Sequence, residues 1–278
     1  GGIAALIAPV KGVLSVITGL GFVFLGEGFK AKFLKSIIGR IYRLALCKRN
    51  LRVLFENPDD RDTLYVLGAF PEGKAELVRG AGVDLAQYAY VPERIQSPIV
   101  CLAARLLRDK GVFEFVAAAK ILRERGIDAR FQLIGDIDPG NPATATENDL
   151  QQWQSDGIVE LLGFRSDVPQ LFAAANVVVL PSYREGLPKV LLEAAACGRA
   201  VITTDVPGCR HAIEQNVSGL LVPLQNVDEL AAAIKRLVSD PELRHKMGKA
   251  GRELAEREFS IDKIVRQYLE IYRKLEKC

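Results

Sequence analysis

The chain of 278 residues has few cysteines, little net charge and only two histidines. The five cysteines form no C-x-x-C pair and leave one over, which argues against a disulfide framework and favours a reducing compartment. The net charge of +3 gives no electrostatic reason to expect a nucleic-acid partner. The cysteines are therefore interpreted as small packing residues, and function has to reside in local motifs.

The sequence also lacks a long apolar run free of interruptions. Residues 1–29 come closest, but Pro9, Lys11 and several glycines interrupt them, so buried strand and turn are expected there rather than a membrane span. The segment has no charged leader or cleavage signal and does not begin with Met. We therefore expect the opening part of the first domain to be missing from this chain.

From residue 98 onward, short β-rich runs alternate with helical stretches, and 49% of the chain is hydrophobic. This alternation predicts an α/β fold with a doubly wound parallel sheet, covered by helices on both faces. In one helical stretch, 226–240, Asn226 is the expected N-cap. The β-rich runs are PIVCLAA, ARFQLIG, GIVELLG, NVVVLPS, RAVITT and GLLVP.

Residues 1–95 contain fewer strands, predicted at 13–17, 52–56 and 75–80. Asn57 followed by Pro58 is typical of a helix start. Three strands make a poor α/β domain, so 1–95 is interpreted as the second half of a first domain. Residues 83–98 are expected to be the linker to a complete second domain, 96–278.

Two acids flank a turn rich in Gly and Pro. Glu185 follows the run NVVVLPS, and Glu193 lies eight residues further on, within a helix expected to begin near Pro188. Ligands of doubly wound sheets bind at the carboxyl ends of the strands, where helix N-termini can hold phosphate. A helical interval of about 12 Å is too long for a glycosidase acid pair at ~5–9.5 Å. The acids are therefore expected to grip two parts of one long ligand, such as a sugar joined through a diphosphate to a nucleoside.

Two cations follow the strand IVCLA at the same edge of the sheet. Arg105 and Lys110 lie in the loop before the next helix, where they could bind a diphosphate and neutralise a leaving group. Each site residue also has a purely structural interpretation. The two cations could be solvated surface charges, and Glu193 could pair with a neighbouring Arg. Glu185 could be an acid at the helix entry that the helix dipole favours.

Together, the motifs RLLRDKG, LIGD, LLGFRSDVPQLFAAANVVVLPS, REGLPKVLLEAAACGRAVITTDVPG and GLLVP resemble the C-terminal half of a retaining GT-B glycosyltransferase of family 4 (group 1). Glu185 and Glu193 match the family's E-x7-E signature. The similarity extends from about residue 98 to the end, and more loosely to VRGAGVDL and TGLGFVF. Bacterial enzymes that extend lipid-linked O-antigen, capsular or N-glycan precursors are the most similar members.

The resemblance implies transfer of a hexose or N-acetylhexosamine from a UDP-sugar with retention of configuration, without a metal or other cofactor. It implies that Arg105 and Lys110 bind the diphosphate and that Glu193 holds the ribose. It also implies that Glu185 is the catalytic residue. The donor sugar and phosphates would be bound by Glu185 and by the turn Gly186, Leu187, Pro188 and Lys189. The final stretch, 260–278, would be a helix that crosses back to the first domain.

Some features leave alternatives open. Leu20 stands where many members carry a His near the donor sugar, which puts the role of the first domain in doubt. His211 either lies near the donor or packs at a helix start, and Phe164 with Arg165 is the best candidate for reading the base. A nucleotide-sugar 2-epimerase and a non-catalytic nucleotide-sugar-binding module are the competing functions.

The stretch 29–49 is basic and amphipathic. Such a helix either lies on an anionic membrane or packs on the sheet with a solvated charged face. The expected location is cytoplasmic, and a lipid-linked acceptor would favour the first alternative, a peripheral position at the cytoplasmic face of the inner membrane.

Overall fold

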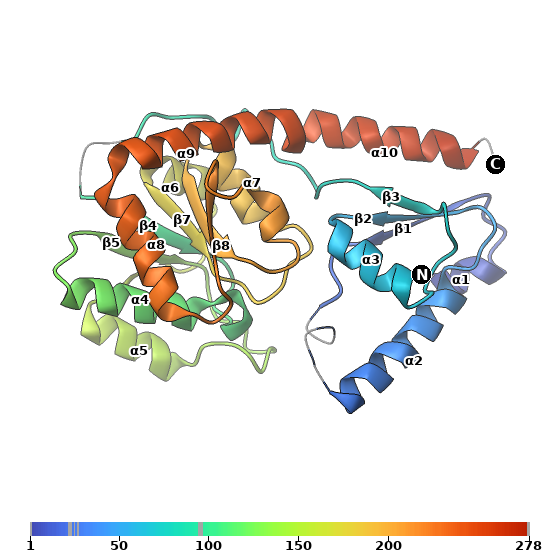
Figure 1. Ribbon diagram of the computed structural model, residues 1–278, viewed down its shortest axis with the longest axis horizontal. Coiled ribbons are helices and arrows are strands. Elements are labelled where there is room, and N and C mark those ends of the chain that lie inside the picture. Colours follow the sequence, from blue (N-terminus) through green and yellow to red (C-terminus); the bar gives the residue numbers. More distant parts are fainter. Residues whose placement is uncertain (1, 22–23, 25, 27, 94–96, 277–278) are drawn as a thin grey trace.

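The computed structural model describes residues 2–21, 24, 26, 28–93 and 97–276. Within these residues the chain forms one parallel sheet of three strands and another of six. Figure 1 shows two bodies side by side, each built on one sheet, with the last helix running out from the six-stranded body along the edge of the three-stranded one. The bodies are called the first and the second domain below.

The first domain is built on β1 (Val13–Ile17), β2 (Leu51–Phe55) and β3 (Ala75–Leu77), paired in parallel in that order. Its helices are α1 (Gly2–Ile7), α2 (Phe29–Ala45) and α3 (Pro58–Val66). Asn57 caps α3 as predicted, because its side-chain oxygen accepts a 2.8 Å hydrogen bond from the Asp60 amide. Leu20 is buried in the core of this domain.

The second domain has the strand order β6-β5-β4-β7-β8-β9, and every neighbouring pair is parallel. The strands are β4 (Ile99–Ala103), β5 (Arg130–Ile134), β6 (Glu160–Leu161), β7 (Val177–Leu180), β8 (Ala200–Thr204) and β9 (Gly219–Val222). The helices are α4 (Val112–Glu124), α5 (Glu147–Asp156), α6 (Val168–Ala174), α7 (Lys189–Ala196), α8 (Val227–Ser239) and α9 (Pro241–Leu254).

Helices cover both faces of this sheet, which confirms the doubly wound α/β prediction. Val177 and Val179 of β7 pack into a core with α4 and α8, whereas Val178 and Leu180 pack into the opposite core with α6 and α7. A strand buried on both faces needs the continuous apolar run that the sequence has here. Asn226 caps α8 by accepting from the Glu229 amide, also as predicted.

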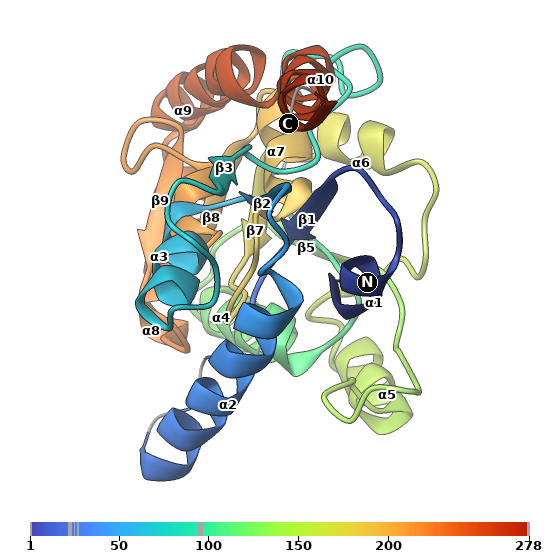
Figure 2. The same cartoon turned by 90° about the vertical axis from the view of Figure 1, so that its right-hand side faces the viewer.

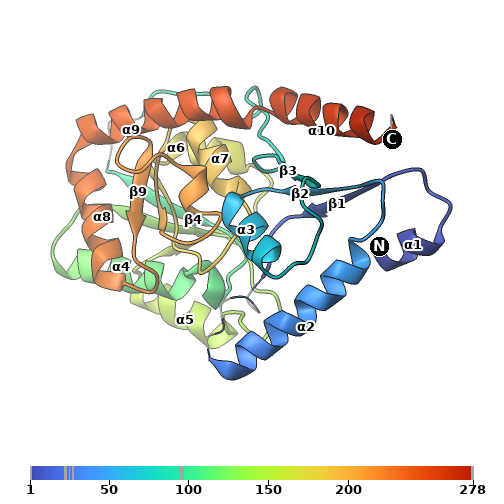
Figure 3. The same cartoon turned by 45° about the vertical axis from the view of Figure 1, so that its right-hand side comes forward.

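The chain crosses between the domains twice, at closely adjacent places. Val83, on the way out of the first domain, exchanges backbone hydrogen bonds of 2.8 and 3.0 Å with Phe259 and Ile261. A π-helical turn, Ala255–Phe259, precedes α10 (Ile261–Glu276), which lies along the first sheet (Figure 3). Ile271 of α10 is buried there against Leu54 of β2.

Three local predictions need correction. Residues 2–7 form a helix rather than buried strand, because GIAALI contains good helix formers, and Ile7 is exposed. The third strand ends at Leu77 instead of 80, since the chain turns at Gly80, whose φ is 75°. The run GIVELLG contributes only Glu160–Leu161. Part of 1–29, part of the linker and the last two residues lie outside the described residues.

Candidate active site

The segment 181–188, called the donor turn below, joins β7 to α7 at the carboxyl edge of the second sheet. Pro188 is the N-cap residue and Lys189 begins the helix, as predicted. Pro188 makes no side-chain capping bond, so the amides of the first turn of α7 have no capping side chain. A helix start without a capping side chain, where an anion could bind, therefore lies at the place where the sequence predicted a helix start.

Glu185 and Lys110 meet at this turn. Lys110 lies at the end of a 3₁₀ turn, Arg108–Lys110, that follows β4. Its Nζ lies 2.5 Å from Glu185 Oε1, and the same oxygen accepts a 2.7 Å hydrogen bond from Ser182. Both charged side chains are partly exposed, at 22% for Lys110 and 14% for Glu185. The pair is thus held in place but open to a ligand.

Arg105 and Glu193 belong to a separate pocket of about 590 Å³ beside the turn. Phe164 and Arg165, the predicted base-reading residues, line the same pocket. Its remaining walls come largely from the segments that follow β4 and β5. In this state Arg105 pairs with Asp138 at 2.7 Å, so the structure does not bring Arg105 and Lys110 onto a common partner.

Glu193 is a buried acid of α7. Its carboxylate lies 3.3 Å from Lys189 Nζ one helical turn earlier, so its ionic neighbour is a lysine and not the arginine of the structural interpretation. Tyr88 is also a neighbour of Glu193, and the pKa of Tyr88 is raised by burial and by the Glu193 carboxylate. Glu193 thus lines the pocket with its carboxylate beside Lys189.

The first domain reaches the donor turn with the carboxyl ends of all three of its strands. A Cβ added to Gly186 would collide with the carbonyl oxygen of Thr18, which follows β1, and would lie 2.8 Å from Glu56 Oε2, after β2. After β3, Gly80 packs against Leu187. Asn57 donates a 2.6 Å hydrogen bond to the Gly186 carbonyl oxygen.

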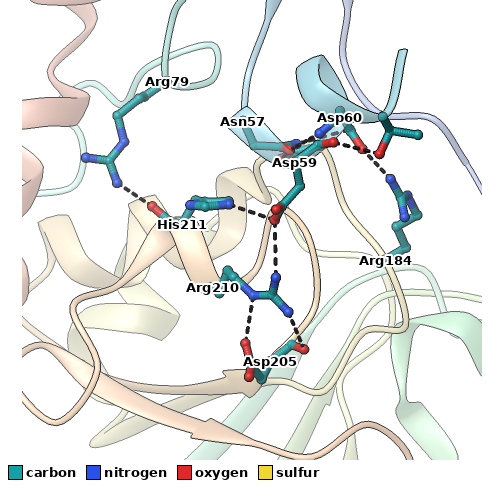
Figure 4. A network of polar contacts seen from close by, with 10 residues as sticks. Asn57, Asp59, Asp60, Arg79, Arg184, Asp205, Arg210 and His211 are labelled. Carbon is teal, nitrogen blue, oxygen red and sulfur yellow. Dashed lines mark hydrogen bonds and ion pairs between the residues drawn. The ribbon is translucent and has the colours of Figure 1, made fainter. Parts of the chain in front are cut away.

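A polar network extends this contact (Figure 4). Asp60 of α3 forms an ion pair with Arg184 of the donor turn, and both side chains are nearly inaccessible. Asp59 accepts from Arg210 at 3.3 Å and lies 2.9 Å from His211 Nε2. His211 therefore links the two domains, which neither of its predicted roles included.

Sequence reasoning missed Glu56, which is buried where the two domains meet. The pKa of its carboxyl is raised to about 7, chiefly by burial and to a smaller extent by Asp60, while a hydrogen bond from the Leu187 amide opposes the rise. A carboxyl group with a perturbed pKa beside a ligand-binding turn is typical of functional sites. The sequence signal was an acid directly after an apolar strand, followed by the helix start at Asn57.

Two α/β sheets that face each other across a donor turn, joined by a helix that crosses back, define the GT-B class of glycosyltransferase. A solved structure supports this fold: sucrose-phosphate synthase from Thermosynechococcus elongatus superposes with a TM-score of 0.79 at 28% identity, over 95% of this chain and 68% of that one. The model of the family described as glycosyl transferases group 1 matches residues 91–254. The chain belongs to this family and is a glycosyltransferase.

Two curated relatives match along nearly the whole chain. N,N'-diacetylbacillosaminyl-diphospho-undecaprenol alpha-1,3-N-acetylgalactosaminyltransferase of Campylobacter jejuni is 31% identical over 98% of this chain and 73% of its own length. UDP-Gal:alpha-D-GlcNAc-diphosphoundecaprenol alpha-1,3-galactosyltransferase of Escherichia coli is 27% identical over 98% and 71%. Other curated relatives match over about half of their length.

Proposed function

We propose that this protein transfers a hexose or N-acetylhexosamine from a UDP-sugar to a lipid-linked saccharide, with retention of configuration. The observation that carries the proposal is the Lys110–Glu185 pair at the uncapped start of α7. The names of the two long relatives, which specify alpha linkages to diphosphoundecaprenol-linked sugars, support the lipid-linked acceptor.

In the proposed mechanism the donor lies across the donor turn. Lys110 and the amides at the start of α7 stabilise the charge that grows on the leaving diphosphate as the glycosidic bond breaks. Glu185 contacts the donor sugar and is the proposed catalytic residue. The sugar leaves the diphosphate for an acceptor hydroxyl on the same face, and the hydroxyl proton passes to the leaving phosphate oxygen.

The rest of the nucleotide fits the neighbouring pocket. Glu193 accepts hydrogen bonds from the ribose, and Arg105 turns from Asp138 to the diphosphate. The base lies against Phe164, whose ring is 80% exposed and available for stacking. We propose that these cations take the place of a metal ion and that no other cofactor is needed.

A membrane role is proposed for α2. Its exposed residues include several lysines and arginines together with apolar side chains, among them Phe29, Phe33, Ile41 and Leu44. Figure 2 shows the helix extending away from the body of the molecule. A merely solvated face would not need these apolar residues, so their exposure favours an anionic membrane surface as the partner. No helix among the described residues is both long and apolar enough to cross a bilayer.

The experiment that tests the function combines the full-length protein with a panel of nucleotide sugars and a short-chain polyprenyl-diphosphate-linked monosaccharide. Mass spectrometry of the lipid product and the anomeric coupling constant by NMR should show one added sugar with the donor's configuration. A rearranged free sugar without an acceptor would identify an epimerase. Tight UDP-sugar binding with no turnover on any acceptor would identify a binding module instead.

A further inference from the structure

Two adjacent residues of the first domain hold one peptide unit of the donor turn. Asn57 donates to the carbonyl oxygen of Gly186 at 2.6 Å, and the carboxylate of Glu56 lies against the amide of Leu187. These are the two polar groups of the peptide bond between Gly186 and Leu187. Asn57 is fully buried and Glu56 is 8% exposed.

The pair is itself held in place. Asn57 caps α3 through the Asp60 amide and donates to the Asp60 carboxylate at 3.0 Å. Asp60 in turn forms the ion pair with Arg184, two residues before Gly186. A side chain restrained in this way can fix the orientation of the peptide that it contacts.

We propose that Glu56 and Asn57 are positioning residues for sugar transfer, which orient the Gly186–Leu187 peptide and so hold the donor turn in register with the first domain. The inference rests on the function proposed above, because the donor turn is there assigned to sugar and phosphate. Neither residue is assigned a contact with the reacting atoms. Their effect reaches the sugar through the turn.

The charge state of Glu56 adds a dependence on pH. The groups that face it are Asp60 from α3, the Leu187 amide from the donor turn, and Tyr268 from α10, whose pKa is raised by its own burial and then by Glu56. Because burial raises the pKa of Glu56 from 4.5 to about 7, the contact between the domains is favoured while the carboxyl is neutral. This contribution is lost as the pH rises from 4.5 to about 7.

The test uses three variants of the whole chain. Asn57→Ser keeps the N-cap but loses the bond to Gly186, Glu56→Ala removes the acceptor for Leu187, and Glu56→Gln keeps an acceptor oxygen without the charge. Glu76→Gln is the control, since Glu76 lies in the same sheet but pairs with Arg52 and Lys274 outside the site.

Amide hydrogen exchange of the segment 181–191 is the readout that does not need activity. Exchange should be at least several-fold faster in Asn57→Ser and Glu56→Ala, and unchanged in Glu76→Gln. In thermal unfolding, Glu56→Gln should raise the midpoint relative to wild type at pH 8.5 and leave it unchanged at pH 4.5. Equal exchange in all variants would overturn the proposal.

Steady-state transfer separates the two proposals. Asn57→Ser and Glu56→Ala should lower kcat about tenfold while the Kd for UDP stays within about twofold, because UDP binds the second domain. Glu56→Gln should lose the decline in kcat that the wild type shows as the pH rises to about 7. A wild type that binds no nucleotide sugar rejects the proposed function, whereas an active wild type with unchanged variants rejects only the positioning role.

Discussion

Lys110 Nζ lies 2.5 Å from Glu185 Oε1, so the cation that follows β4 is already directed at the turn that follows β7. Lys110→Ala should therefore lower kcat/KM for the UDP-sugar about 10- to 100-fold, the cost of losing a charged hydrogen bond of ~1.5–3 kcal/mol. Arg105→Ala should cost less, about threefold to tenfold, because its guanidinium is 61% exposed and paired with Asp138.

Lys120→Ala is the control for both changes, because Lys120 is exposed on α4 away from the turn. Initial transfer rates at varied donor concentration provide the measurement. If Lys110→Ala and Arg105→Ala both matched the control, the diphosphate would have to bind elsewhere.

Glu193 and Glu185 should differ in which part of the donor they affect. Glu193 lines the pocket with Arg105 and Phe164, whereas Glu185 is not among the residues of that pocket. Glu193→Gln should thus raise the Kd for UDP about tenfold, and Glu185→Gln should leave it within about threefold. Calorimetric titration with UDP alone and with the UDP-sugar measures both effects. If Glu185→Gln weakened UDP binding more than Glu193→Gln did, Glu185 would be the ribose ligand and Glu193 the residue at the donor sugar.

Gly186 should tolerate no side chain. A Cβ there would collide with the carbonyl oxygen of Thr18, so Gly186→Ala has to push the first domain away from the donor turn. We expect transfer to fall at least 100-fold, because small displacements of reacting groups are costly, while UDP binding persists. Gly140→Ala is a matched control in an open loop at the same edge of the sheet, where the nearest atom to a new Cβ is 3.8 Å away. Full activity of Gly186→Ala would show that the catalytic state is more open than this structure.

Vesicle binding should depend on the apolar side of α2. Replacing Phe29 and Phe33 with Ser should reduce co-sedimentation with anionic phosphatidylglycerol vesicles about tenfold or more, since both rings are exposed. Val66→Ser provides the control, because Val66 is 84% exposed on α3 but outside this basic segment. Equal binding by wild type and the double variant would favour the solvated-face interpretation of α2.

Local features of the fold could be predicted because local chemistry specifies them. The run at 177–180 has a length and composition that only a buried strand satisfies, and Asn57 and Asn226 are caps that a few neighbouring residues determine. The first turn of α7 and its flanking acids were found for the same reason. The short helix at 2–7 was missed because six residues carry too little periodicity to separate helix from strand.

Contacts between the domains were beyond such reasoning. Arg184 and Asp60 are 124 residues apart in the sequence, and His211 and Asp59 are 152 apart. Each member of these pairs is compatible with a solvated surface when considered by itself. Only the folded chain shows that Glu56 is covered by the partner domain, and burial is the main cause of its raised pKa.

The paired crossings at Val83 and Phe259–Ile261 act as a double tether between the domains. Two connections at one edge restrict how far one domain can turn or drift away from the other. Each domain therefore meets its partner at a high effective concentration, so the interface beside the donor turn can be small and reversible and still re-form after every opening. If one connection were cut, the other would still keep the domains close together. The two domains would then no longer be held in the correct relative orientation at the donor turn.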